Sequence, residues 1–483
     1  MSSLRKSFAS GIFYTAIAKY SNVISTFVIS AILARLLTPK EFGIVALVSV
    51  FVTFFNLLGN FGLGKAVVQN QELTKNDNES IFNFSIVFAI VLGAGFFFSA
   101  PLIARFYGEP VLVEITRLLS LSVLFHTLNV IPKAILEKNL KFKLIGIVSI
   151  GVQIITGIIA IILAYKDYSY FALVIKSVLG GAVSFLVLYS LSPIKLTTNF
   201  KRSSLEKVLS FSIYNFLFNF INYFTRSGDN LIVGKFLGSA QLGFYDKAYR
   251  LMMLPVHQLT HVITPVMIPI LSKYQDKNKL VYNTYSKVVK ILATVGLPLS
   301  VFLFFSANEI INIIYGPQWD KSIPVFKVLS LIIGMQIIYS SAGSVFLSIG
   351  RTKLLFNYGL LSSSILIACI SLGIFVGGNL VAVGYGIVIG FLMNFFIVYY
   401  LLINVALEAS MLKFLKCLIY PTVTAIGMVI PLYFISNFGN LNMYLSLILK
   451  LMISLLIFGL FTLSVKENRK ILREGLQNFI RNT

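Results

Sequence analysis

Apolar runs fill most of the chain, and polar residues fall between them. Each run is long enough for the helix of about 20 residues that crosses the hydrocarbon core of a bilayer. Helices are expected because lipid cannot satisfy a bare backbone. We therefore predict an all-α polytopic membrane protein with about 14 transmembrane helices. The runs lie near residues 12–36, 41–64, 81–105, 113–136, 144–165, 170–190, 208–236, 242–271, 285–306, 323–348, 353–376, 380–405, 413–434 and 442–465.

Composition supports this class. The chain has 57% hydrophobic and only 12% charged residues, which one soluble core of 483 residues could not hide. The net charge of +23 would suggest nucleic acid in a soluble protein. Here the basic residues punctuate apolar runs, as in the cytoplasmic loops of membrane proteins, so we predict no nucleic-acid partner. Cys369 and Cys417 lie inside apolar runs and indicate neither a disulfide nor a metal site.

The distribution of lysine and arginine predicts the topology. Starting from a cytoplasmic N-terminus, the loops and termini on the cytoplasmic side carry 26 of these residues and the opposite side carries 6. This asymmetry places both termini in the cytoplasm. The last segment, residues 466–483, is basic and is predicted as a cytoplasmic tail, either a short interfacial helix or a frayed end.

The sequence also contains an internal repeat. At an offset of 200, identities include Leu37 with Leu237 and Gly43 with Gly243, and the pattern of residues 98–121 recurs at 305–331. Six spans per copy make these parallel repeats. We predict an N-terminal lobe at 1–200 (spans 1–6), a C-terminal lobe at 201–408 (spans 7–12), and two additional spans at 409–465.

Charges inside the predicted spans are the main functional signal. Each costs at least about 2.5 kcal/mol at the centre of a membrane, so those retained normally face a wet cavity or a partner. Acids are few, chiefly Asp229 and Asp246, and a cavity lined in this way attracts an anion. The basic residues that we single out within spans are Lys19, Arg117, Lys176, Arg226, Lys327 and Lys450.

Arg226, Lys19 and Asp229 are the first candidates for substrate contact. The alternative for Arg226 is an ion pair with Asp229 at i,i+3, and for Lys19 a side chain that reaches the headgroups. Asp246 and Arg250, at i,i+4, are interpreted as a structural pair. The secondary candidates are Arg117, Lys176, Lys327 and, by repeat position, Asn22, Asn222, Tyr14 and Tyr214. Arg117, Lys176 and Lys327 could instead anchor helices at the membrane interface.

Several motifs carry a family resemblance. They are L-A-R-L-L-T-P-K-E-F-G at 33–43, G-N-F-G-L-G-K-A-V-V-Q at 59–69, I-P-K-A-I-L-E-K-N-L-K-F-K at 131–143, D-N-L-I-V-G-K-F-L-G-S-A-Q-L-G-F-Y at 229–245 and I-Y-G-P-Q-W-D-K-S-I-P-V-F-K-V-L-S-L at 314–331. Together they resemble the polysaccharide exporters, or O-antigen-type flippases, of the multidrug and oligosaccharidyl-lipid/polysaccharide exporter superfamily.

The resemblance implies a transporter and not an enzyme, with no cofactor. It implies two lobes facing across a central cavity and transfer of an undecaprenyl-diphosphate-linked oligosaccharide across a bacterial plasma membrane by alternating access. Membrane lipids and other polysaccharide assembly proteins are the partners it suggests. It does not fix the sugar.

Two other functions are weighed against this one. A cation-coupled multidrug antiporter of the same superfamily would use embedded carboxylates, whereas the embedded charges here are mostly cations. A membrane-embedded polysaccharide polymerase would show a sizeable extracytoplasmic loop or a cluster of acidic and histidine residues at one face. His257 and His261 lie one turn apart, but no third ligand lies near in sequence, so no metal site is predicted.

Overall fold

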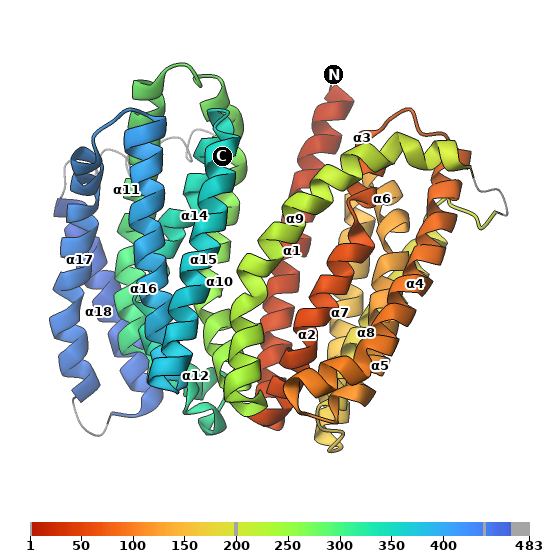
Figure 1. Cartoon of the computed structure of the whole chain (residues 1–483). Coiled ribbons are helices and arrows are strands. Elements are labelled where there is room, and N and C mark those ends of the chain that lie inside the picture. Colours follow the sequence, from red (N-terminus) through yellow and green to blue (C-terminus); the bar gives the residue numbers. More distant parts are fainter. Residues whose placement is uncertain (1, 198–200, 438–440, 465–483) are drawn as a thin grey trace. The chain divides into compact units, whose positions relative to one another are not determined.

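The protein is described here from a computed structural model, which covers residues 2–197, 201–437 and 441–464. Within these ranges every regular element is a helix (Figure 1). The chain forms two compact units, Met1–Gly243 and Phe244–Thr483. The predicted basic tail at 466–483 lies outside the described residues.

The first unit contains nine complete helices and the start of a tenth. They are α1 (Ser2–Leu36), α2 (Pro39–Asn60), α3 (Leu63–Gln69), α4 (Lys75–Tyr107), α5 (Leu112–Leu128), α6 (Val130–Lys138), α7 (Phe142–Tyr165), α8 (Phe171–Leu191), α9 (Arg202–Leu237) and the first turn of α10 (Ser239–Ser272).

The second unit holds the rest of α10 and the remaining helices. They are α11 (Asn278–Phe305), α12 (Ala307–Ile314), the 3₁₀ turn η1 (Pro317–Trp319), α13 (Ser322–Ser330), α14 (Ile333–Ser348), α15 (Thr352–Gly377), α16 (Leu380–Tyr399), the π-helix η2 (Tyr400–Ala406), α17 (Met411–Asn437) and α18 (Met443–Ser464).

The helices confirm a polytopic membrane chain. Eleven helical segments in the described ranges are long and apolar enough to cross a membrane, and the bent pair α13 and α14 makes a twelfth. The helices α9 and α10 lie where the seventh and eighth spans are predicted, and they contain 36 and 34 residues. The count of 14 stays a prediction.

Three predicted spans are each built from two helices. The chain turns at Phe61 and Gly62, both with left-handed backbone angles, between α2 and α3. It breaks at Asn129 between α5 and α6, three residues before Pro132, whose ring cannot continue the preceding helical turn. The axes of α13 and α14 differ by 56°. These breaks lie within continuous apolar runs, so hydropathy alone did not reveal them.

The first quoted motif starts α2 through a capping box. The Thr38 hydroxyl accepts a hydrogen bond from the Glu41 amide, and the Glu41 carboxylate accepts one from the Thr38 amide at 2.6 Å. Pro39 occupies the first helical position, where its missing N–H costs nothing. Glu41 also accepts a hydrogen bond from the Ser169 hydroxyl, just before α8. The motif thus fixes where α2 begins and ties that point to α8.

The helix α9 packs within the first unit. Phe216, Phe220 and Tyr223 lie three or four residues apart along α9. They meet the rings of Phe54 on α2 and of Phe61, which directly follows α2. The Tyr223 hydroxyl donates to the Val50 carbonyl at 2.7 Å. Since α9 would be the first helix of the predicted C-terminal lobe, the compact units divide the chain after the repeat boundary. The predicted lobe limits concern the sequence repeats and stay a prediction.

Candidate functional site

Four sequence candidates cannot be placed. The side chains of Arg226, Tyr14, Tyr214 and Asn222 lie outside the described residues. The backbone puts Arg226 on α9, one turn before Asp229. Whether the two side chains pair therefore stays open.

Asp229 is described, and its side chain is buried on α9 with 8% of the residue exposed. One carboxylate oxygen accepts the backbone N–H of Asn230 at 2.7 Å. A buried carboxylate needs compensating donors, which agrees with either role proposed for Asp229. Its contact with a substrate stays a prediction.

The two candidates on α1 whose side chains are described differ in their surroundings. Lys19 is exposed. Asn22 donates through its amide nitrogen to the Ser149 hydroxyl on α7 at 2.9 Å. One turn further, Gln153 on α7 donates to the Thr26 hydroxyl at 3.1 Å. Asn22 therefore belongs to a pair of hydrogen bonds that joins α1 to α7.

The secondary basic candidates lie at separate places. Arg117 is exposed on α5, with its guanidinium carbon 5.1 Å from the centre of the Phe97 ring, a distance typical of cation–π contact. Lys176 on α8 and Lys327 on α13 are half-buried. No ion pair joins either to a carboxylate in the part of the chain that the structure describes. Their roles stay predictions.

Lys450 on α18 is neutralised by a partner that the sequence did not suggest. Its ammonium nitrogen lies 2.5 Å from Glu309 Oε1 on α12, and both side chains are buried. The same oxygen accepts the Ser446 hydroxyl at 2.7 Å, and Lys450 also donates to the Phe305 carbonyl at 2.8 Å. This cluster holds α18 against α12.

Arg250 on α10 has the geometry of an anion receptor. Its Nε donates to both carboxylate oxygens of Asp246, at 2.8 and 2.7 Å. The Arg250 side chain is nevertheless 67% exposed, against 14% for Asp246. Asp246 thus holds the inner edge of the guanidinium, and the two terminal amino groups are left open. A fixed planar fork of donors suits a carboxylate or a phosphate.

The position of Arg250 along α10 bears on what its guanidinium can contact. Arg250 lies eleven residues after the start of α10, roughly 16 Å along the helix axis. If α10 crosses the membrane over the predicted span 242–271, Arg250 is the ninth residue of that span and lies in the first half of a hydrocarbon core about 30 Å thick. An exposed charge at that depth requires water or an anion beside it.

Next to this pair, Lys247 is enclosed by aromatic rings. Its ammonium nitrogen lies 5.2 Å from the centre of the Tyr315 ring and 5.7 Å from that of Trp319, and only 2% of the residue is exposed. We call these three residues the lysine cage. Tyr315 lies between predicted spans, and burial, together with the nearby charge of Asp246, raises the pKa of its phenol.

Family comparison decides what kind of protein carries these features. A model of the polysaccharide biosynthesis protein family matches residues 32–324. The chain belongs to this family. The match spans the capping motif of α2, the Asp246–Arg250 pair and the lysine cage. It confirms the resemblance drawn from the sequence motifs.

Two relatives are similar to this chain over most of their length. The teichuronic acid biosynthesis protein TuaB of Bacillus subtilis is 25% identical over 361 residues, which is 74% of each chain. The lipopolysaccharide biosynthesis protein WzxC of Escherichia coli is 22% identical over 429 residues, covering 87% of this chain and 85% of WzxC.

Solved structures share the fold. The lipid II flippase MurJ, in an inward closed conformation, matches with a TM-score of 0.77 and 17% identity over 95% of this chain and 99% of MurJ. An inward-facing multidrug transporter of the MATE family matches with a TM-score of 0.64 and 14% identity over 78% of this chain and 93% of the transporter. The chain thus combines membership of the polysaccharide biosynthesis protein family with the fold of the transporters of this superfamily.

The sequence predicted the pair of Asp246 and Arg250 but did not reveal that the terminal amino groups of Arg250 are open. The i,i+4 spacing predicts the pair and says nothing about exposure of the guanidinium. It also missed Glu309, which lies 141 residues from Lys450. A signal for Glu309 was available, because it follows Ser306 in the S-x-x-E pattern of a capping box. The Ser306 hydroxyl makes no such cap, and Glu309 binds Lys450 instead.

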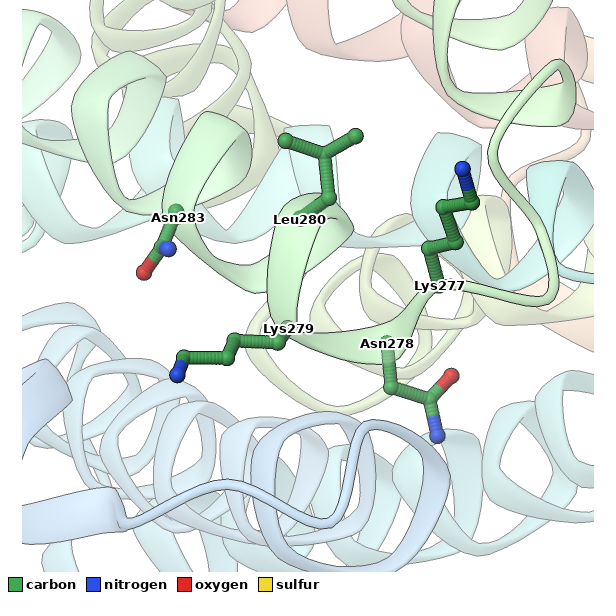
Figure 2. A pocket seen from close by; sticks show the side chains of 5 residues that line it. All are labelled: Lys277, Asn278, Lys279, Leu280 and Asn283. Carbon is green, nitrogen blue, oxygen red and sulfur yellow. The ribbon is translucent and has the colours of Figure 1, made fainter.

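The second unit also has an open depression at the start of α11, about 440 Å³ in volume. Figure 2 shows that its lining comes from one short stretch, with the side chains spread around the helix. Since they do not converge on a common point, they do not form a site of the kind seen at Arg250. The lining residues are Lys277, Asn278, Lys279, Leu280 and Asn283.

Proposed function

We propose that this protein is a flippase that carries a diphosphate-linked prenyl oligosaccharide from the cytoplasmic to the outer leaflet of a bacterial plasma membrane. Both termini are assigned to the cytoplasm. The transported molecule is an undecaprenyl-diphosphate-linked repeat unit, and transport proceeds by alternating access through a cationic central cavity. Family membership and relatives named for lipopolysaccharide and teichuronic acid biosynthesis support this proposal, as does a fold like that of a lipid II flippase.

The observation that carries the proposal is the open edge of the Arg250 guanidinium. A lipid-linked sugar presents a diphosphate at the junction between its apolar tail and its hydrated head. The terminal amino groups of Arg250 match phosphate oxygens in geometry and charge. Asp246 keeps the fork oriented before substrate arrives, which reduces the entropy lost on binding.

The other cations extend the same chemistry. Arg226 and Lys19, with Asp229 as a balancing acid, are proposed to line the path together with the secondary candidates. Several cations along a path let the diphosphate pass from one to the next without a deep binding minimum. The sugar head requires water in the path, whereas the prenyl tail stays in lipid.

A cation-coupled multidrug antiporter is the second candidate, since the MATE fold is shared. Such a transporter binds cations and needs accessible carboxylates within the membrane. Here Asp246 is bound to Arg250, and Glu309 to Lys450. Asp229, the other acid singled out within a predicted span, is buried. The charge balance therefore favours an anionic substrate.

The test is export of surface polysaccharide in a deletion strain complemented with wild type or a variant at matched membrane abundance. Arg250→Gln and Arg226→Ala should each lose surface polymer and accumulate the lipid-linked unit inside, whereas Arg250→Lys and Arg226→Lys should retain part of the export. Arg105→Gln is the matched control, because Arg105 is an exposed arginine at the end of α4. Unchanged polymer in the deletion strain itself would overturn the flippase proposal.

A further inference from the structure

The turn that follows α12 contains the motif Tyr315-Gly316-Pro317-Gln318-Trp319. Gly316 has φ +99°, a backbone conformation that residues with a Cβ rarely adopt, so the turn depends on glycine. The Trp319 amide donates to the Gly316 carbonyl at 3.2 Å. The ring centres of Tyr315 and Trp319 are 5.9 Å apart, and both residues are buried. The motif thus builds a rigid aromatic wall.

This wall contacts α10 at two successive turns. Phe244 meets Trp319 edge to face, with ring centres 6.0 Å apart. The Phe244 carbonyl accepts the Ser322 hydroxyl at 2.9 Å. Three residues later Lys247 enters the lysine cage. Residues three apart lie on one face of a helix, so the wall holds one face of α10 and resists rotation about its axis.

The contact between α10 and the aromatic wall fixes the direction in which the Arg250 side chain points. Lys247 and Arg250 are also three residues apart, yet Lys247 is 2% exposed whereas the Arg250 side chain is 67% exposed. A helix rotation that released Lys247 from the cage would carry Arg250 with it. Burying the charge of Lys247 is costly unless the rings compensate for lost hydration. A role in orienting α10 accounts for keeping a lysine there.

We infer that Lys247, Tyr315 and Trp319 are positioning residues that set the open edge of Arg250 toward a prenyl diphosphate. This inference rests on the proposed function. It also gives the Tyr-Gly-Pro-Gln-Trp motif a role, because the motif supplies both rings of the cage. Lys247 acts through the orientation of α10 and does not touch the diphosphate.

The experiment uses Trp319, the single tryptophan of the chain, as its own reporter. The full-length protein in detergent is titrated with farnesyl diphosphate, with farnesol as the uncharged control, while tryptophan emission is recorded. Wild type and Lys247→Arg, which keeps the cation–π contact, should bind with similar affinity. Lys247→Met should bind about tenfold more weakly, which corresponds to about 1.4 kcal/mol. Arg250→Gln should abolish saturable binding.

A second measurement separates orientation from loss of charge. Arg250→Cys is placed in a Cys369→Ala/Cys417→Ala background, and its reaction rate with a charged methanethiosulfonate is compared with and without Trp319→Leu, which leaves Lys247 intact. The rate at position 250 should fall severalfold. A cysteine at Leu280, exposed on α11, is the control and should react unchanged; equal slowing at both positions would indicate general disruption.

The outcomes distinguish this inference from the proposed function. Equal affinity of wild type and Lys247→Met for farnesyl diphosphate, with an unchanged cysteine rate at position 250, would overturn the positioning role and leave the flippase proposal standing. Failure of wild type to bind farnesyl diphosphate more tightly than farnesol would remove the anion receptor itself. Weak binding by Lys247→Met with full rescue by Lys247→Arg is the expected result.

Discussion

Gly43 and Gly243, which occupy equivalent positions in the two sequence repeats, lie against each other where α2 and α10 begin. A Cβ on Gly43 would lie 1.7 Å from the Ser239 carbonyl oxygen, and a Cβ on Gly243 would lie 2.0 Å from that of Pro39. Pro39 and Ser239 are themselves 200 residues apart. The two helix starts therefore exchange equivalent contacts, as the two halves of a two-fold interface do.

This contact predicts that alanine is damaging at either glycine. Gly43→Ala or Gly243→Ala should destabilise the protein by about 1–3 kcal/mol, since a backbone oxygen cannot move aside as a side chain can. Thermal unfolding in detergent measures the effect. Gly180→Ala on α8 is the control, because no atom lies within 4 Å of its Cβ position, and it should be neutral or stabilising by about 0.5–1 kcal/mol.

The double variant sharpens this test. Once one alanine has separated α2 from α10, the second has less to displace, so the combined cost should be smaller than the sum. Strict additivity would mean that the two glycines do not share one contact.

The buried pair of Lys450 and Glu309 gives a second prediction. Lys450→Met should cost about 3–5 kcal/mol, because it leaves the Glu309 carboxylate buried without its cation. The double variant Lys450→Met/Glu309→Met should recover much of that loss. Lys133 and Glu137 provide the control: their side chains lie 3.8 Å apart and are 50% and 37% exposed, so removing that pair should cost no more than about 0.5 kcal/mol. Thermal unfolding of these variants would show whether α18 depends on the buried pair.

A third prediction concerns hydroxyl groups inside the second unit. Tyr399 is fully buried and donates to the Ile338 carbonyl at 2.9 Å. Its oxygen also lies 2.8 Å from the Tyr285 hydroxyl, which in turn lies 3.0 Å from the Ser341 hydroxyl. Tyr399→Phe should cost about 1–3 kcal/mol, because it leaves buried groups without partners.

The neighbouring residue is the control for this prediction. Tyr400 is 56% exposed, and Tyr400→Phe removes the same hydroxyl from a surface position. Its unfolding temperature should match that of wild type. A drop of equal size in both variants would contradict a role for the buried network.

Sequence periodicity predicted the helices well because each apolar run must cover a membrane. It could not predict which helices pack together. The aromatic residues Phe216 and Phe220 give α9 an apolar face, but nothing in their spacing shows that the face meets Phe54 on α2 and Phe61 just after it. The partner of a helix is decided by the fold of the whole unit.

The same limit applied to the charged residues. Sequence reasoning treated Lys450 as an embedded cation because its partner, Glu309, is remote in sequence. It interpreted Asp246 and Arg250 as a closed pair because spacing reveals contact but not exposure. The signal is complete in the sequence only where both groups are local, as in the Thr38–Glu41 capping box, which the T-P-K-E motif contains in full.

The last prediction separates two roles for Asn22. Its amide donates to the Ser149 hydroxyl between α1 and α7, so a structural role predicts that Asn22→Ala and Ser149→Ala lower stability by similar amounts, about 0.5–1.5 kcal/mol. Their combination should then cost little more than either alone. Polysaccharide export should follow stability in all three variants. If Asn22 binds the sugar instead, Asn22→Ala should reduce export at unchanged unfolding temperature while Ser149→Ala retains it. Measuring unfolding and export on the same preparations therefore decides whether the asparagine identified from the repeat contacts a helix or a substrate.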